Sequence, residues 1–356
     1  MLKIVKKKES SSMQSTLLRI GSVLIALVAS AAFIAALGYN PFVVYQNIVA
    51  GSVGSAYRFQ ETINKTIPLV VLSLGIAVSF KMKFMNIGAE GQFYLGAMAA
   101  TAIALNFPTW PIYILIPLMM LGAIIAGGIW CLFPAVLKSK FGTSETLVTL
   151  MMNYIAVKFV SYLQYGPWKD PKAKGFPRIA KFSVNAVLPK VFGIHMGWII
   201  ALVLVVIIYI IMSKSKLGYQ ISVLGENENT AKYAGMDTTK ILFISVIIGG
   251  GLCGLAGMIQ ASGIEGSLTD QLSGGLGFTA IITAWLANLS APAILVVSFF
   301  FAILVQGSTY IQSSMQIPSA VAEILQGIII FFVLASEFFT QYKFVLVHKV
   351  HKEAAK

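Results

Sequence analysis

The sequence is poor in charged residues and in cysteine, and each shortage excludes a class of protein. Only 11% of its 356 residues are charged and 57% are hydrophobic, whereas a soluble domain carries about 25% charged residues. Too little polar surface is left to cover a water-soluble globule, and disordered, collagen-like and disulfide-rich chains are excluded as well. The two cysteines, Cys131 and Cys253, lie in apolar runs and are interpreted as buried thiols. The composition predicts an all-α, polytopic transmembrane helical bundle.

Motifs of soluble enzymes are also missing. The sequence has no G-x-x-x-x-G-K-[ST] phosphate-binding loop and no recognisable Ser/His/Asp set. Gly249, Gly251 and Gly254 fit G-x-G-x-x-G, but they lie in the apolar run 247–259, where small residues four positions apart favour close helix packing. The three histidines lack metal-ligand spacing: His195, His348 and His351. We therefore expect no enzymatic activity, no metal and no cofactor in this chain.

Ten apolar segments are predicted to cross or enter the membrane. A helix needs about 20 apolar residues to cross the hydrocarbon core, and three segments are short enough to be broken or re-entrant helices. The first resembles a signal peptide, but its long apolar run and poor cleavage site predict a retained span. The expected organisation is a basic segment 1–16, a membrane domain 17–338 and a basic tail 339–356. The predicted spans are 17–37, 67–80, 93–106, 111–133, 146–163, 198–212, 241–261, 278–289, 291–306 and 320–338.

The net charge of +13 is interpreted as an orientation signal rather than as a nucleic-acid footprint. If the N terminus is cytoplasmic, 17 of the 26 Lys and Arg residues fall on the cytoplasmic side, as the positive-inside rule requires. Ten spans then place the C terminus inside as well. The outside loop 164–197 is the exception, because it carries six cations against the single acid Asp170.

Polar groups at membrane depth are the candidate functional positions, because they are costly in lipid and face an interior or a cavity. Glu90 lies in the Gly-rich stretch 86–92, which predicts a broken helix. Two interpretations stay open: a wall or gate of a translocation path, or a packing hinge whose carboxylate pairs with a lysine or with backbone. A second Gly-rich break covers 273–278, and one break in each half is typical of transporters with a central path.

Two other predicted spans contain or adjoin polar side chains. Glu145 follows Ser144 at the start of a predicted helix, where a serine N-cap and the helix dipole favour a structural role. Asn153 lies deeper in that helix and must hydrogen-bond either another helix or a polar solute. Glu323 and Gln326 share one face of the last span.

The longest cytoplasmic loop, 213–240, is predicted to contain a short helix. Asn227 is a candidate N-cap with Thr230 at the third helical position, and Gly235 is a natural left-handed stop. A helix this short is marginal alone, so it needs a partner. Two interpretations stay open: a coupling helix seated in a groove of another subunit, or an amphipathic connector on the bilayer.

Six ordered motifs resemble the permease subunits of ABC importers of the branched-chain amino acid and simple sugar class. The second motif, at 145–155, resembles the version found in bacterial nucleoside permeases. The chain departs from the usual pattern at 285–288, where Trp-Leu-Ala-Asn replaces a run ending in Gly-Arg or Gly-Asn. The motifs lie at 85–92, 145–155, 227–235, 254–257, 275–278 and 325–327.

The resemblance implies a subunit of a bacterial cell-membrane importer that moves nucleosides by alternating access. Cytoplasmic partner subunits would bind ATP and Mg²⁺, a second permease subunit would complete a heterodimer, and an extracellular lipoprotein would deliver the solute. A ribose-like sugar permease and an ion-coupled secondary transporter are the alternatives. The expected substrate path comprises Asn86, Glu90, Gln92, Asn153 and Phe278. The expected contacts with the ATPase comprise Gly225, Asn227, Asn229, Ala231, Tyr233, Ala234 and Gly235.

Overall fold

The computed structural model divides the chain into two compact units, residues 52–306 and residues 1–51 with 307–356. Most of the predicted span 320–338, with Glu323 and Gln326, lies outside the described residues, as do residues 7–11 and most of the basic tail 339–356. The structure describes 2–6, 12–173, 175, 177–318, 320–321, 324–325, 327–328, 331–332, 335 and 342–346.

The smaller unit contains two apolar helices joined by a sharp bend. The predicted first span is α1, Ser12–Ala36, and the helix α2, Pro41–Val53, follows it at an angle of 115° to the last turns of α1. Gly38 adopts a left-handed conformation in the bend, which favours glycine. Two strands, β1 (Leu2–Lys6) and β4 (Tyr342–Leu346), pair antiparallel. Neither α2 nor this ribbon is predicted by the apolar pattern, because both lie outside its long apolar runs.

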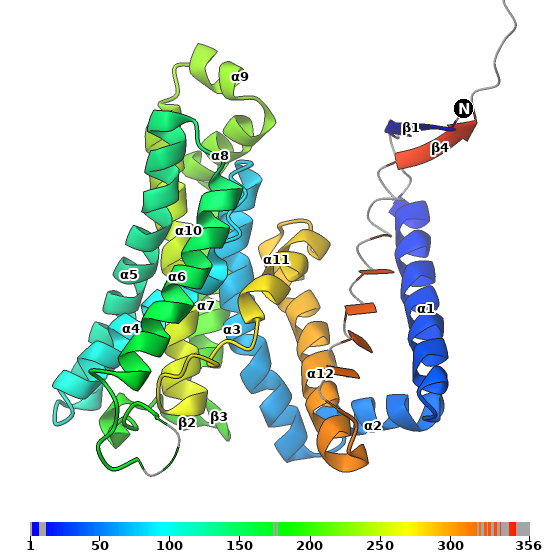
Figure 1. Ribbon diagram of the computed structural model, residues 1–356. Coiled ribbons are helices and arrows are strands. Elements are labelled where there is room, and N and C mark those ends of the chain that lie inside the picture. The colour runs from blue at the N-terminus through cyan, green and yellow to red at the C-terminus, as the bar shows by residue number, and fades with distance from the viewer. Residues whose placement is uncertain are drawn as a thin grey trace, which may run out of the picture. The chain divides into compact units, whose positions relative to one another are not determined.

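The larger unit is a helical bundle with a connecting helix pair at one end and a hairpin at the other. The pair α8 and α9 lies at the top in Figure 1, and β2 and β3 lie at the bottom. The helices are α3 (Ala56–Lys81), α4 (Ala89–Asn106), α5 (Ile112–Phe141), α6 (Glu145–Tyr165), α7 (Gly197–Lys214), α8 (Lys216–Glu226), α9 (Glu228–Tyr233), α10 (Thr238–Gln260), α11 (Leu276–Leu286) and α12 (Ala291–Met315). The shorter elements are the 3-10 turn η1 (Val184–Ala186), the π-helix η2 (Ala261–Glu265) and the strands β2 (Lys190–Val191) and β3 (Ile194–His195).

Helix α10 lies at the centre of this unit and packs closely against α3, α4 and α5. Its glycines make this approach possible. A Cβ at Gly257 would collide with the carbonyl oxygen of Phe93 on α4, and one at Gly254 would collide with that of Ala123 on α5. The glycine-rich run is therefore a helix-packing surface, as its small-residue spacing indicates.

The expected number of ten spans is not confirmed. Within the described residues six helices are long and apolar enough to cross a membrane, or seven if α1 and α2 form one broken span. The predicted span 67–80 is the apolar part of the longer α3, whereas 278–289 falls on α11, which has only 11 residues. The side of the membrane on which each end lies stays a prediction.

Candidate functional site

The chain breaks between α3 and α4 at 82–88, which only overlaps the predicted broken stretch 86–92, because residues 89–92, with Glu90, form the first turn of α4. Helix α3 ends at Lys81, α4 begins at Ala89, and the residues between them are buried or half-buried apart from Lys83. The side chains of Asn86 and Gln92 exchange two hydrogen bonds of 3.1 and 2.9 Å. The Asn86 Oδ1 atom also accepts from the Gly88 amide. The polar side chains at the break therefore satisfy each other's hydrogen-bonding groups and one backbone amide.

Asn153 of α6 forms hydrogen bonds that attach this break to α6. Its Oδ1 accepts from the Gly91 amide, and its Nδ2 donates to the Ile87 carbonyl, both at 2.8 Å. One turn earlier on α6, the Thr149 Oγ1 atom accepts from the Ile87 amide at 3.2 Å. Asn153 is only 3% exposed, so its two hydrogen bonds replace those that water would make.

Glu145 begins the same row on α6 and has a structural role, as predicted. Its Oε1 atom accepts from the Lys138 ammonium at 2.6 Å and from the Met85 amide at 3.4 Å. The expected serine cap is wrong in one respect. Ser144 occupies the N-cap position, but its side chain makes no capping hydrogen bond, and the carboxylate beside it is held by the lysine instead.

Glu90 joins the two breaks. Its Oε2 atom accepts from the Gly277 amide at 2.8 Å, in the first turn of α11. The residues before α11 make an irregular turn in which Gly274 and Gly275 have positive φ angles. Of the two partners considered for the Glu90 carboxylate, lysine or backbone, the structure supplies backbone. Phe278, the next residue on α11, is 43% exposed.

A second polar cluster, which the sequence pattern does not reveal, lies beside the second break. The hydroxyl of Tyr94 donates to the Asp270 carbonyl at 2.8 Å and accepts from the Ser273 amide. Ser161 donates to the Asp270 carboxylate, and Gln164 accepts from the Asp270 amide, each at 3.0 Å. The spacing of Ser161 and Gln164 on one face of α6 is the only signal that points to the cluster.

The short helix predicted in the loop 213–240 is α9. The Asn227 side chain caps it by accepting from the amides of Asn229 and Thr230. The chain leaves the helix through Ala234, and Gly235 adopts the predicted left-handed conformation with φ of 72°. Within α9, Ala231 is buried in the permease itself, so its expected contact with the ATPase is wrong, whereas Tyr233 is 92% exposed.

A polar groove of about 440 Å³ lies beside α9. The turn 82–84 forms one wall, the end of α5 another, and the junction of α8 and α9 a third. Lysines 83, 138 and 232 line it together with Glu226 and Glu228. Lys138 and Lys232 are engaged in ion pairs with Glu145 and Glu228.

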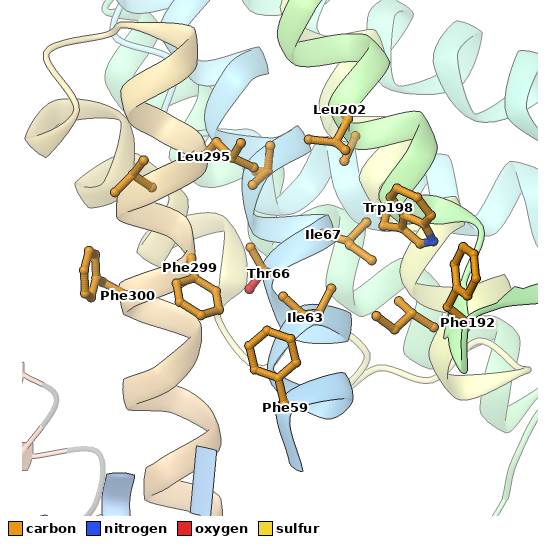
Figure 2. Close-up of a pocket in the computed structure, with 14 residues that line it drawn as sticks. Phe59, Ile63, Thr66, Ile67, Phe192, Trp198, Leu202, Leu295, Phe299 and Phe300 are labelled. Carbon is orange, nitrogen blue, oxygen red and sulfur yellow. The ribbon is translucent and has the colours of Figure 1, made fainter. Parts of the chain in front are cut away.

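A larger groove of about 590 Å³ lies between α3, α7 and α12, and its chemistry is different (Figure 2). Phe59 of α3 meets Phe299 of α12 edge to face, with ring centroids 6.2 Å apart. Thr66 and Trp198 are the only lining residues with a polar side-chain atom. A polar solute would find few hydrogen-bonding partners there, so this groove is a weaker candidate for a solute path than the region around Glu90.

The loop 166–196, which joins α6 to α7, is anchored to η2 at the end of α10. The Ser262 hydroxyl donates to the Ala186 carbonyl at 2.6 Å, and the Phe182 amide donates to the Gly266 carbonyl at 2.8 Å. His195 ends the loop and is 1% exposed, with its Nδ1 atom accepting from the Gly197 amide. Burial lowers the pKa of His195 to about 4, so the ring is neutral near pH 7.

Among the described residues no group of three or more His, Cys, Asp or Glu side chains could hold a metal ion.

Comparison with known proteins identifies the family. Residues 58–334 match the family described as "Branched-chain amino acid transport system / permease component". The chain belongs to this family. It is therefore an ABC transporter permease subunit and a multi-pass membrane protein.

Three relatives resemble the permease over most of their length. The glucose ABC transporter permease protein TsgB13 of Haloferax volcanii is 32% identical, over 90% of this chain and 88% of the relative. The guanosine ABC transporter permease protein NupP of Bacillus subtilis is 31% identical, over 88% and 92%. The nucleoside ABC transporter permease protein NupB of Lactococcus lactis is 28% identical, over 88% of each.

Proposed function

We propose that the permease imports a nucleoside by alternating access, driven by ATP-binding partner subunits. The observation that carries the proposal is the similarity to two nucleoside permeases, NupP and NupB, along nearly the whole chain. The buried polar junction around Glu90 supports it, because a neutral nucleoside offers hydrogen-bonding edges and a base face that stacks on aromatic rings.

We further propose different roles for the five expected path residues. Phe278 is exposed and faces the solute, with Glu90 behind it. Asn86, Gln92 and Asn153 use their amides on each other and on backbone groups, so they hold the wall of the path in shape. Breaking and re-forming the hydrogen bond between the Gly277 amide and the Glu90 carboxylate is the step that opens or closes the path.

The partners proposed for the permease follow from its family and from two surfaces. Cytoplasmic subunits that bind ATP and Mg²⁺ would seat α9, and a second, different permease subunit would complete the membrane part. The basic outer loop would receive an extracellular substrate-binding lipoprotein. Exchanging the exposed cations of the loop for glutamine should weaken binding of that protein, and unchanged binding would refute the contact.

A simple sugar is the second candidate solute, because the relative TsgB13 is named as a glucose permease and is 32% identical. A nucleoside and a ribose-like sugar share hydroxyl groups but differ in the base. The side chain of Phe278 separates the two candidates, since the base gains from an aromatic face. Phe278→Ala should therefore weaken transport of a nucleoside more than transport of a sugar.

Uptake into proteoliposomes tests the proposal. The permease is reconstituted with its proposed ATP-binding, second permease and binding-protein partners, and ATP is enclosed. We expect uptake of radiolabelled guanosine that requires ATP, competed by unlabelled nucleosides but not by glucose or ribose. Uptake of glucose or ribose without uptake of guanosine would show that the solute is a simple sugar. Uptake driven by a proton gradient without ATP would establish a secondary transporter.

A further inference from the structure

Helix α8 rests directly on the end of α3. A Cβ at Gly225, near the end of α8, would collide with the carbonyl oxygen of Lys81 and lie 3.2 Å from the Cα of Met82. Gly225 is buried in this contact, so the expectation that it touches the ATPase is wrong. Two backbones that touch without an intervening side chain cannot slide independently, because packed interiors have no free space to absorb a displacement.

Lys83 adds a polar contact to the same junction. Its Nζ atom donates to the carbonyl of Glu226, the last residue of α8, at 3.3 Å. A cation at the C-terminal end of a helix is favourable, because the carbonyl groups there are unpaired. The backbone of Lys83 has φ of 58°, a left-handed conformation that lysine rarely adopts and that is common at functional sites.

The turn that carries Lys83 leads without interruption to the candidate solute path. The next residues form the break, which Thr149 and Asn153 fasten to α6. Helix α4 then begins, and its Glu90 is bonded to Gly277 of α11. A displacement of α8 and α9 therefore has a continuous covalent and hydrogen-bonded route to Phe278, with no flexible linker in it.

We propose that Gly225 and Lys83 are positioning residues that transmit movement of α9 to the break at 82–88 and from there to Glu90 and Phe278. The inference rests on the proposed function, in which a partner ATPase moves α9. Gly225 transmits a push through its backbone contact with the end of α3. Lys83 keeps the turn attached when α8 moves away.

The experiment measures whether nucleotide changes the accessibility of the path. Phe278→Cys introduces a reporter thiol, and Cys131 and Cys253 are both fully buried. The full complex is placed in nanodiscs, and the rate of N-ethylmaleimide labelling is compared without nucleotide and after trapping with ATP and vanadate. ATP hydrolysis is measured on the same samples, and a complex without the reporter cysteine gives the background.

Four variants of the reporter complex separate transmission from folding. Lys83→Gly removes the ammonium group and also relieves the left-handed backbone, so it does not destabilise the turn. Lys83→Arg retains a donor. Gly225→Ala forces the two backbones apart, and the protein still folds because α8 lies at one end of the bundle and can shift, unlike α10 at its centre. Lys140→Ala is the charge-matched control, because Lys140 is exposed on the last turn of α5 and lies outside the polar groove.

In the reporter complex and the Lys140→Ala control we expect trapping to change the labelling rate by about fivefold or more, as a typical coupling free energy gives. Lys83→Gly and Gly225→Ala should hydrolyse ATP but label at one rate with and without trapping, and Lys83→Arg should restore the change. A full change in both Lys83→Gly and Gly225→Ala overturns the inference. Loss of hydrolysis in Lys83→Gly also overturns it, because Lys83 would then belong to the docking surface. If the reporter complex itself hydrolyses ATP without any change in labelling, the proposed function fails, and the inference fails with it.

Discussion

Asn153 offers the most direct test of the junction between α4 and α6. Replacing it with leucine keeps a similar volume but removes both amide atoms. The Gly91 amide and the Ile87 carbonyl, each bonded to Asn153 at 2.8 Å, would lose their partner in a buried environment. We therefore expect Asn153→Leu to loosen the break and to lower the stability of the permease.

The expected loss follows from two buried hydrogen bonds. A buried group left unsatisfied in a protein costs about 1–3 kcal/mol, but interhelical hydrogen bonds in membranes average only about 0.6 kcal/mol because the unfolded state finds other partners. Two such bonds give a destabilisation of about 1–6 kcal/mol. Asn153→Asp should also destabilise, because a second oxygen would face the Ile87 carbonyl.

The assay is unfolding of the purified permease in nanodiscs, followed by the exposure of its buried cysteines to a thiol-reactive dye. Tyr154→Phe is the matched control, because the neighbouring Tyr154 is 61% exposed and points away from the break. Asn153→Leu should unfold at a clearly lower temperature than the wild type, and Tyr154→Phe should not. Equal unfolding temperatures for all three proteins would refute the reasoning, since the bonds would then carry no net stability.

Three further outcomes are expected. Gly257→Ala should prevent stable folding because its Cβ would collide with the Phe93 carbonyl. The control Gly21→Ala has open space around it and should fold normally. Equal yields of monodisperse protein from the two variants would contradict this. Because the pKa of His195 is about 4 when folded against an ordinary 6.5, the unfolded chain binds more protons between these values. Stability should therefore fall by about 3 kcal/mol as pH drops from 6.5 to 4, and His195→Gln, which has no such titration, should show a shallower fall in unfolding temperature; parallel curves would exclude His195 as the cause. Ala234→Glu, on the exposed end of α9, should abolish ATP-dependent uptake while membrane insertion stays normal, and normal uptake would remove α9 from the contact with the ATPase.

Local features of the chain are predictable from its sequence because they depend on neighbouring residues. The short helix α9 is one example, since its cap at Asn227 and its stop at Gly235 lie within nine residues of each other. The broken stretch before α4 is another, because glycine and polar groups at membrane depth are incompatible with a continuous lipid-facing helix. Apolar helices such as α6 and α7 also match their predicted spans closely, whereas α5 runs eight residues past its predicted end at 133.

The partners of the candidate site residues are not predictable in the same way. Glu90 and Gly277 are separated by 187 positions, and nothing in either local pattern names the other. The row of Glu145, Thr149 and Asn153 has the four-residue spacing of one helix face, which is visible in the sequence. Its target, the backbone of the break, depends on how α4 and α6 pack. Helix α2 escapes prediction because its moderate apolar pattern follows a bend.

ATP-dependent uptake of guanosine by the reconstituted complex is the measurement that tests the central claim most directly. The account predicts that guanosine accumulates only when ATP is enclosed, that an imposed proton gradient has no effect, and that Phe278→Ala weakens uptake of guanosine. Accumulation that follows the proton gradient and ignores ATP would contradict the account, as would a complex that hydrolyses ATP and moves glucose or ribose but no nucleoside.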